Sequence, residues 1–210
     1  FSGDKLEKSY LIGFRIGDLG VRKIYTNSKT ICVASGSTVK EQIDLIKNLF
    51  EKYGKIWDKT KKGKINIQIN LNESFNFLLS KKVPIWILNN EDYFLSFLAG
   101  FTDAEGCISI NNGMAYYSLG NCDFNLLSII REKLNKLEFS CNISTSKRKG
   151  KPTIDGYFFS SDYHQLRIDR KAVLLQLFTK LKTFIKHENK IKALNMAIEN
   201  IGQRNLKYGK

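Results

Sequence analysis

The stretch FLAGFTDAEG, Phe97–Gly106, decides how the rest of the chain is interpreted. It is an apolar helical run that carries a glycine and ends in two carboxylates, although glycine costs about 1 kcal/mol relative to alanine inside a helix. The pattern occurs twice, because SYLIGFRIGD (Ser9–Asp18) aligns without a gap on SFLAGFTDAE (Ser96–Glu105). Serine, leucine, glycine and phenylalanine are identical in the two copies. The sequence therefore contains an internal repeat.

Each copy is followed by the same order of predicted elements: a hairpin, a helix, a second hairpin and a closing helix. In the first copy the hairpins cover 21–35 and 55–71 and the helices 38–54 and 72–80; in the second copy the hairpins cover 107–120 and 140–168 and the helices 123–138, 171–186 and 187–201. The fold class we expect is α+β, with two pseudo-symmetric αββαββα repeats and antiparallel sheets. The predicted boundaries are 1–82 for the first repeat, 83–90 for a linker marked by Pro84, and 91–210 for the second repeat with its C-terminal helices.

Charge indicates the kind of partner. The 210 residues include 34 lysines and arginines against 20 acids, a formal net charge of +14. Such a balance in a well-packed chain favours a polyanion, and we expect nucleic acid. An inert basic surface and an anionic lipid surface are the alternatives, but no basic amphipathic helix of the membrane-surface type is present. No apolar run is long enough to span a membrane, so we expect no membrane partner.

Cysteine usage indicates the compartment. Cys32, Cys107, Cys122 and Cys141 form no C-x-x-C pair, and the two histidines lack zinc-finger spacing. We therefore expect neither a zinc site nor a disulfide framework, and an intracellular location. The abundance of lysine, asparagine and isoleucine is typical of an AT-rich genome, which leaves bacterial cytoplasm or nucleoid and an organelle (mitochondrion or chloroplast) as the alternatives.

Small residues recur at helical spacing in both copies. Gly13 and Gly17 lie four residues apart, as do Gly100 and Ala104. This spacing places two small side chains on one helix face, where a second backbone can approach closely. We expect the two helices to pack against each other, the alternative being small residues that fill a crowded place within each domain separately.

The acids at the helix ends are the candidate chemistry. Asp18 and Glu105 occupy equivalent positions at the C-terminal ends of the two helices, where the helix dipole disfavours a carboxylate. Two like charges brought together there would be compensated by divalent cations, and Mg²⁺ commonly uses one or two carboxylates with substrate phosphate oxygens. The alternative is a pair of exposed helix-end acids. Asp103, opposite Ile16 in the repeat, is predicted to be a surface carboxylate that pairs with a lysine, or else a further metal ligand.

YLIGFRIGD and FLAGFTDAEG resemble the two signature helices of the LAGLIDADG homing endonucleases, in the monomeric form with both repeats fused. The resemblance covers most of the chain. It implies paired LAGLIDADG helices at the domain interface and two sheets that form a DNA-binding saddle. The implied function is site-specific cleavage of double-stranded DNA at a long, poorly palindromic site, with Mg²⁺ as cofactor and Mn²⁺ or Ca²⁺ as substitutes in binding. It also implies a functional monomer that requires no protein partner.

The resemblance assigns roles to particular residues. Asp18 and Glu105 match the metal-binding catalytic acids, and Gly17 and Ala104 precede them at the predicted metal site. Ile16 stands where the first motif often has an acid, and Leu19 precedes its second glycine. Lys171 is the candidate for the basic residue that family members hold near the metals, with Arg170 second. A solvated cation at the start of a helix is the alternative for Lys171.

Exposed strand positions are the candidates for DNA reading. Alternation along 64–71 places Lys64, Asn66, Gln68 and Asn70 on one face and apolar residues on the other. Amides and cations on a free sheet face suit base edges and phosphates, although any exposed strand is polar. The other candidates are Arg22, Lys23, Tyr25, Asn27, Lys29, Ser144, Ser146, Arg148, Tyr157, Gln165, Arg167 and Arg170, with Ser35 and Asn121 as DNA contacts or helix caps.

Three functions explain the paired acids to different degrees. The metal-dependent endonuclease explains the paired acids. An intron maturase or a non-cleaving nucleic-acid-binding protein on the same scaffold is the first alternative, because such proteins can retain the acids. A structural or lipid-surface protein is the weakest, since it leaves the acids unexplained.

Overall fold

The chain divides into two units that are each described separately. The structure is a computed structural model, which describes residues 1–153 and 155–209. The first unit consists of Phe1–Ala104 and Phe184–Asn189, and the second contains the remaining described residues. The segment 184–189, distant in sequence, thus packs with the N-terminal half of the chain.

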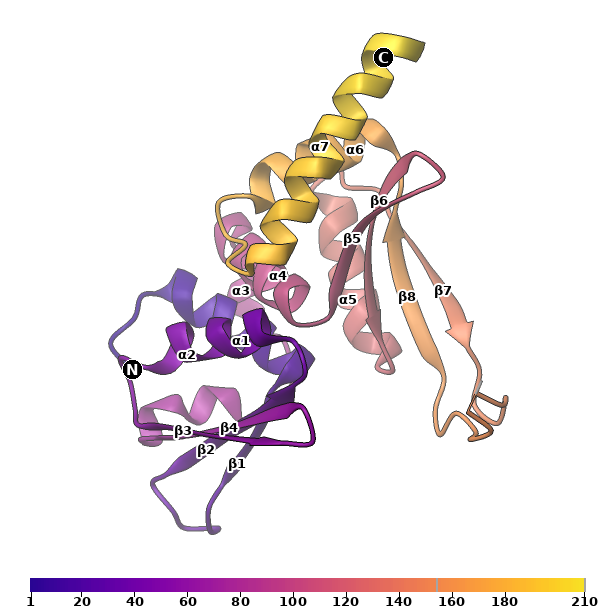
Figure 1. The fold of residues 1–210 in the computed structure, drawn as a ribbon. Coiled ribbons are helices and arrows are strands. Elements are labelled where there is room, and N and C mark those ends of the chain that lie inside the picture. The colour runs from indigo at the N-terminus through magenta and orange to yellow at the C-terminus, as the bar shows by residue number, and fades with distance from the viewer. Residues whose placement is uncertain (154, 210) are drawn as a thin grey trace. The chain divides into compact units, whose positions relative to one another are not determined.

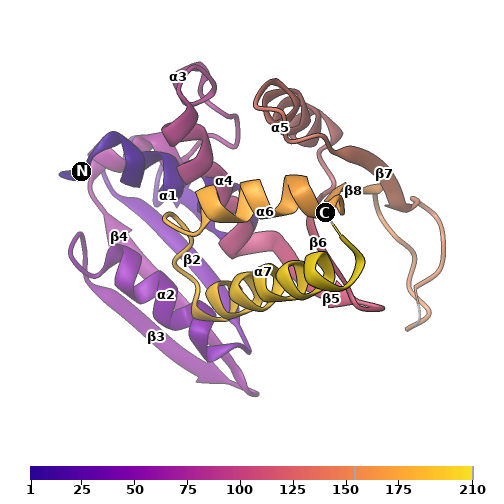
Figure 2. The same cartoon turned by 90° about the horizontal axis from the view of Figure 1, so that it is seen from above.

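The first unit is built on a four-stranded antiparallel sheet of order β1-β2-β4-β3 (Figures 1 and 2). Its elements are α1 (Lys5–Asp18), β1 (Gly20–Lys23), β2 (Ile31–Ser37), α2 (Lys40–Phe50), β3 (Ile56–Lys61), β4 (Lys64–Leu71), the 3-10 helix η1 (Glu73–Leu78), α3 (Ile85–Leu88) and α4 (Glu91–Glu105), of which the last residue belongs to the second unit. Ile67, Ile69 and Leu71 are buried on the sheet face that α2 contacts. The tight turn between β3 and β4 uses Lys62 and Gly63, both with positive φ.

The second unit repeats the same design with a sheet of order β5-β6-β8-β7 (Figure 1). Its elements are β5 (Gly106–Asn111), β6 (Met114–Asn121), α5 (Phe124–Lys136), β7 (Asn142–Lys147), β8 (Tyr163–Ile168), α6 (Lys171–Leu181) and α7 (Glu188–Tyr208). Asn112 and Gly113, both with positive φ, form the predicted turn of the first hairpin. The α+β class and the two antiparallel sheets are confirmed.

The structure differs from the predicted elements at three places. The closing helix expected over 72–80 is the 3-10 helix η1, and the expected linker contains the short helix α3. The second hairpin of the second unit has short strands, because only Asn142–Lys147 and Tyr163–Ile168 are in the sheet. The compact units also differ from the predicted repeat boundaries, since α4 packs in the first unit as far as Ala104.

The helices α1 and α4 cross at two glycines. A Cβ atom added to Gly13 would lie 2.9 Å from the amide nitrogen of Phe101, and one added to Gly100 would lie 3.0 Å from that of Phe14. Carbonyl oxygens of the facing helix, from Phe97 and Tyr10 respectively, would be closer still. Backbone therefore packs directly on backbone at this crossing, as the spacing of the small residues predicts.

Asp103 is buried and anchors the segment that returns from the second unit. Its side chain is 1% exposed. Its Oδ2 accepts hydrogen bonds from the hydroxyl of Tyr10 at 2.5 Å and from the backbone N–H groups of Lys186 at 2.7 Å and His187 at 3.2 Å. The prediction of a surface carboxylate paired with a lysine is therefore wrong. Backbone donors, which sequence patterns do not reveal, compensate the buried charge.

Tyr10 is expected to make this network sensitive to alkaline pH. Its burial, and then its proximity to the charge of Asp103, raises the pKa of the Tyr10 phenol well above its usual value of 10.0. At pH 7 we expect Tyr10→Phe to lower the free energy of unfolding by about 1–3 kcal/mol, because a buried carboxylate loses a donor. Above pH 10 the unfolded state releases the phenolic proton while the folded state retains it, so the wild type loses stability as pH rises.

Urea denaturation from pH 7 to above pH 10 measures this effect. The stability difference between the wild type and Tyr10→Phe should shrink as pH rises above 10. Tyr208→Phe is the control, because the Tyr208 side chain is 69% exposed, and it should match the wild type at every pH. A difference for Tyr10→Phe that stays constant across this range would contradict the explanation.

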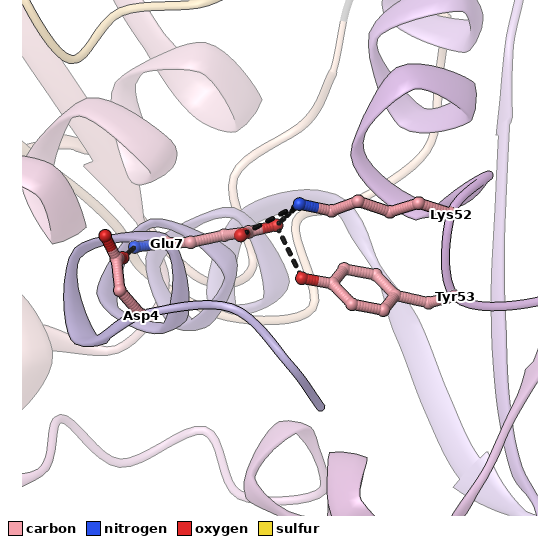
Figure 3. A network of polar contacts seen from close by, with 4 residues as sticks. All are labelled: Asp4, Glu7, Lys52 and Tyr53. Carbon is pink, nitrogen blue, oxygen red and sulfur yellow. Dashed lines mark hydrogen bonds and ion pairs between the residues drawn. The ribbon is translucent and has the colours of Figure 1, made fainter.

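A second polar network holds the start of α1 against the end of α2 (Figure 3). Asp4 caps α1 by accepting the backbone N–H of Glu7 at 2.8 Å. The Glu7 carboxylate in turn accepts the Tyr53 hydroxyl at 2.9 Å and pairs with the Lys52 ammonium at 2.9 Å. The network fixes the N-terminal end of α1 and leaves its C-terminal end for the candidate site.

Among the residues that the structure describes, none of the helices combines the length and the apolar character needed to cross a bilayer.

Candidate active site and nucleic-acid interface

Asp18 is the last residue of α1 and is held by two neutral side chains of the first unit. Its Oδ2 accepts the Gln42 side-chain amide at 2.9 Å and the Ser35 hydroxyl at 3.3 Å. Gln42 lies on α2 and is buried, and Ser35 lies on β2. Neither residue is close to Asp18 in sequence. The carboxylate is thus oriented without being neutralised, because both donors are uncharged.

Arg15 fixes the end of α1 from the other side. Its buried guanidinium donates from Nε to the carbonyl of Leu78 at 2.8 Å and from a terminal nitrogen to the carbonyl of Leu19. Burial lowers the pKa of Arg15 from its usual value. A cation here satisfies carbonyl groups beyond the last turn and complements the negative end of the helix dipole. The position of Asp18 is therefore set by Ser35 and Gln42, from outside its sequence motif, and by Arg15 within it.

Glu105 is the last residue of α4, is exposed, and precedes β5 directly. Tyr163, the first residue of β8, lies across Gly120 of β6: a Cβ atom added to Gly120 would be 2.5 Å from the phenolic Cζ. Burial, and then the negative charge of Glu105, raises the pKa of Tyr163 above its usual value. Tyr163 therefore lies within electrostatic range of Glu105, which the sequence patterns did not reveal. The only sequence signal for it is the glycine that makes room for its ring.

A cation accompanies Tyr163. The Lys147 ammonium lies 5.5 Å from the centroid of the Tyr163 ring and 5.3 Å from that of Phe159, within the range of cation–π attraction. Lys147 and Tyr163 are partners in the register of β7 and β8. A basic residue is thus present beside the Tyr163 ring.

Lys171 lies at the other end of the second sheet. Gln165 of β8 is opposite Gly120, close to where β5 begins, whereas Ile168 is opposite Tyr117 and the chain then leaves the sheet. Lys171 starts α6, and its ammonium donates to the carbonyl of Gly209 at 2.5 Å. This placement does not favour Lys171 as the basic residue beside Glu105, because about five strand positions separate the two ends.

Arg170, the second candidate, precedes Lys171 as the N-cap residue of α6. It lines a pocket of about 400 Å³ together with Arg167, Asp169 and Glu138. The mixture of cations and acids gives this pocket no single charge preference. Arg170 shares the location of Lys171 at this end of the sheet.

The first sheet has an outer face, opposite the face that α2 contacts. Residues paired across antiparallel strands lie on the same face, so the register assigns each side chain. Gln68 is opposite Ala34 of β2 and Trp57 of β3, and Asn66 is opposite Gly36 and Lys59. The outer face consists of Arg22, Cys32, Ala34, Gly36, Trp57, Lys59, Lys61, Lys64, Asn66, Gln68 and Asn70.

This assignment changes the predicted set of DNA contacts in the first unit. Trp57, Lys59 and Lys61 join the predicted amides, and the sequence analysis missed them because the register of β3 was unknown. Lys23 is opposite Ile31 and so lies on the other face from Arg22, which disagrees with their grouping. The predicted strand residues Tyr25, Asn27 and Lys29 are in the exposed loop after β1, where the N–H of Ser28 bonds the carbonyl of Tyr25 and the chain turns.

The second sheet presents a similar outer face. Ser144 of β7 is opposite Gln165 of β8, and Gln165 donates at 3.1 Å to Ser118 of β6, a diagonal neighbour on the same face. Arg167 lies on the same face, with its guanidinium 4.4 Å above the ring of Tyr116. The predicted residues Ser144, Gln165 and Arg167 are thus brought together.

The remaining predicted residues of the second unit are not on this face. Asn121 is opposite His164, and its Oδ1 accepts the N–H of Asp123, the residue that caps α5. Ser146 lies at an irregularity of β7 and bonds the carbonyl of Tyr163. Arg148 and Tyr157 lie in the segment between β7 and β8, and Tyr157 is 75% exposed. Because these two residues lie outside the strands, alternation assigns them to neither sheet face, and their predicted strand positions are wrong.

Two α+β units, each with a four-stranded antiparallel sheet, and helices α1 and α4 that cross at glycines define the fold of the two-repeat homing endonucleases. Residues 92–180 match the LAGLIDADG-like domain family. A comparison with curated proteins finds no match.

Three solved structures show how far the likeness extends. I-DmoI, in a complex with DNA and Ca, is 16% identical with a TM-score of 0.62, over 91% of this chain and 98% of that chain. I-WcaI, bound to its DNA recognition sequence, is 17% identical with a TM-score of 0.58, over 90% of this chain and 86% of that one. Full-length DUF199/WhiA from Thermatoga maritima is 14% identical with a TM-score of 0.55, over 99% of this chain and 69% of that one. The likeness establishes the fold, which is not confined to proteins described as endonucleases.

Proposed function

We propose that this protein is a site-specific, metal-dependent endonuclease of double-stranded DNA, a homing endonuclease that recognises a long, poorly palindromic site. The observation that carries the proposal is the crossing of α1 and α4. Asp18 and Glu105 each lie five residues beyond the glycine at which their helix packs, and the two helices run in the same direction. We propose that these acids together form the catalytic centre.

The direction of the two helices is supported by contacts at several levels. The hydroxyl of Ser96, early in α4, donates to the carbonyl of Leu6, early in α1. Asp103, late in α4, accepts the hydroxyl of Tyr10. In parallel helices, residues early in one helix contact residues early in the other, and later residues contact later ones. These two contacts follow that order, so both helices end on the same side of their crossing. Asp18 and Glu105, at matched positions, therefore end their helices on the same side of the crossing.

The donor chemistry fits Mg²⁺. Asp18 offers Oδ1, which accepts no hydrogen bond from the described residues, and Gly17 and Ala104 offer backbone carbonyl oxygens. Among residues 1–153 and 155–209 no three histidine, cysteine or acidic side chains gather as a metal site, which suits a cation held by one or two carboxylates, waters and phosphates rather than zinc. When bound, Mg²⁺ would lower the pKa of a coordinated water and offset charge on the leaving oxygen. I-DmoI has been crystallised with DNA and Ca and with DNA and Mn.

The surrounding residues would prepare this centre. The Gln42 amide and the Ser35 hydroxyl hold one oxygen of Asp18, so that the other points away from them. The Tyr163 phenol lies within electrostatic range of Glu105, and the Lys147 ammonium lies beside the Tyr163 ring, so both could donate to a phosphate oxygen held nearby. Fixed donors of this kind stabilise charge that develops in a transition state. Lys147 replaces Lys171 as the basic residue that we propose for the centre.

The outer faces of the sheets would bind the duplex. They carry cations and amides, and the chain has a net charge of +14. We propose that the protein acts as a monomer, because both repeats are present in one chain, and that it works inside a bacterial cell or an organelle. A non-cleaving nucleic-acid-binding role, or a maturase, is the second candidate, which the shared fold of DUF199/WhiA favours.

Binding to DNA is expected to cover two sheet lengths and to depend steeply on salt. β4 has eight residues, which at about 3.3 Å each span about 26 Å, or roughly 8 bp at about 3.4 Å per step. Two sheets therefore protect about 16 bp. With six or more phosphate contacts, affinity should fall at least about 10³-fold between 50 and 200 mM salt.

Selection from a randomised duplex library supplies the site, and footprinting and titrations at several salt concentrations measure these quantities. Incubation of the selected duplex with Mg²⁺ then tests cleavage. Protection of only one sheet length, or binding that salt does not change, would contradict the two-sheet interface. Specific binding without any cut under Mg²⁺ or Mn²⁺ would favour the non-cleaving candidate.

A further inference from the structure

The outer face of the first sheet carries an unbroken line of amides. Asn66, Gln68 and Asn70 occupy its three successive outward positions on β4, which is an inner strand of the sheet. A single long hydrogen bond joins two of these three amides, from Gln68 Nε2 to Asn70 Oδ1 at 3.5 Å. Their donors and acceptors are therefore largely available to a ligand.

The neighbours of these amides are small, apolar or cationic. Ala34 and the half-exposed ring of Trp57 lie on either side of Gln68 in the register. Gly36 lies beside Asn66, and a Cβ atom there would be 2.8 Å from the amide oxygen of Asn66. Because Gly36 has no side chain, the amide of Asn66 can occupy the space above it. A groove of about 530 Å³ passes over Ala34, Trp57, Asn66 and Gln68.

Asp58 also lines the groove, but the outward strand positions carry no carboxylate. Asp58 of β3 is opposite Ile67 and therefore points to the helix side, where it pairs with Lys47 of α2. The outward positions of β1 to β4, all of which are described, contain no other acid. The face therefore lacks the acceptor-only group that would select the amino group of cytosine.

We propose, on the basis of the proposed DNA-binding function, that the first sheet reads an A·T-rich segment through Asn66, Gln68 and Asn70. An amide offers one donor and one acceptor side by side, which matches N7 and the N6 amino group of adenine in the major groove. Ala34 and Trp57 offer apolar contact to the methyl group of thymine. A guanine is instead contacted by the donors of an arginine or a lysine; Arg22 lies two strands from Asn70, across Cys32, and Lys59, Lys61 and Lys64 gather at the other end of the line.

The spacing defines the segment. Outward positions on one strand are about 6.6 Å apart, close to two base-pair steps of about 3.4 Å. Three amides therefore contact about every second base pair over a segment of about 5 bp. The bias to A·T is confined to the half of the site that the first sheet covers.

A Gln68→Arg variant tests the assignment in duplex selection. The wild-type pool should contain a segment of about 5 bp enriched in A·T. Gln68→Arg should change the preference at one position of that segment from A·T to G·C and leave the other half of the site unchanged, because an arginine pairs with guanine. The ratio of affinities for two duplexes that differ at this position should shift by about 5- to 100-fold.

Gln203→Arg is the matched control, since it adds the same charge at an exposed amide of α7. Gln203→Arg should leave the ratio of affinities for the two duplexes unchanged, because any gain from the added charge is the same for both. A pool with no sequence preference would overturn site-specific recognition itself. A selected site without an A·T-rich segment, or a Gln68→Arg pool that matches the wild-type pool, would overturn the assignment of the amides while leaving the endonuclease proposal intact.

Discussion

Replacing Asp18 by Asn or Glu105 by Gln is expected to stop DNA cleavage while DNA binding persists. Each substitution preserves size and removes one charge, so neither should unfold the protein. Loss of a partner that only orients a metal ligand typically costs 10–100-fold in metal affinity or activity, so loss of a ligand should cost more than about 100-fold. Binding without metal should be unchanged, because the cations of the sheets contact the phosphates.

The measurement is cutting of each strand of an end-labelled duplex, with the duplex taken from library selection. If the acids share a metal, both strands slow together in each variant; if they do not, one strand is still cut and a nick accumulates. Asp44→Asn and Glu199→Gln are matched controls, because both acids are exposed on helix surfaces and contact only neighbours on their own helix. A variant at Asp18 or Glu105 that cuts both strands at the wild-type rate would remove that acid from the catalytic centre.

The second large effect concerns the helix crossing. Gly13→Ala and Gly100→Ala each place a methyl group against the backbone of the facing helix, which no rotamer change can relieve. Overpacking of this kind costs about 1–3 kcal/mol, and we expect the upper end because the obstructing atoms are backbone. The gain in helix propensity, about 1 kcal/mol, is too small to compensate.

Gly202→Ala in α7 is the control for this pair. Gly202 is also helical, but nothing lies within 4 Å of an added Cβ atom. This variant should be stabilised by about 0.5–1 kcal/mol through helix propensity alone. Guanidinium denaturation of the three variants measures the differences. If Gly13→Ala and Gly100→Ala were as stable as Gly202→Ala, the close approach of α1 and α4 would be refuted.

The fold could be predicted because its signals are local. The repeated apolar helix, the alternation in 64–71 and the turn at Asn111–Gly113 each depend on residues that are neighbours in sequence. The shared glycine spacing also predicted the helix crossing, since small residues four apart lie on one face. The two helix-end acids were identified as candidates for the same reason: their position relative to the glycines is fixed by helical geometry.

The surroundings of those acids could not be predicted in this way. Gln42 donates to Asp18 from another helix, and the charge of Glu105 acts on Tyr163, which lies on a strand that begins 58 positions later in the chain. The family resemblance placed Lys171 near the catalytic centre because this residue follows the last strand. The direction of β8 instead places Lys171 at the end of the second sheet that is distant from Glu105. The order and register of the strands in the sheet are needed to establish this, and they depend on pairing between segments that are far apart in the chain.

Asp103 shows most clearly which features the sequence determines and which depend on the tertiary structure. The sequence by itself determined that this residue lies in the last turn of the second signature helix, because the spacing of apolar residues sets the helix. Only the tertiary structure decided that it is buried, since the compensating donors are the Tyr10 hydroxyl and the backbone N–H groups of Lys186 and His187. Periodicity specifies which face of an element is apolar. What meets that face is decided by packing between segments far apart in the chain, and every residue has a backbone N–H that could serve as the partner except proline.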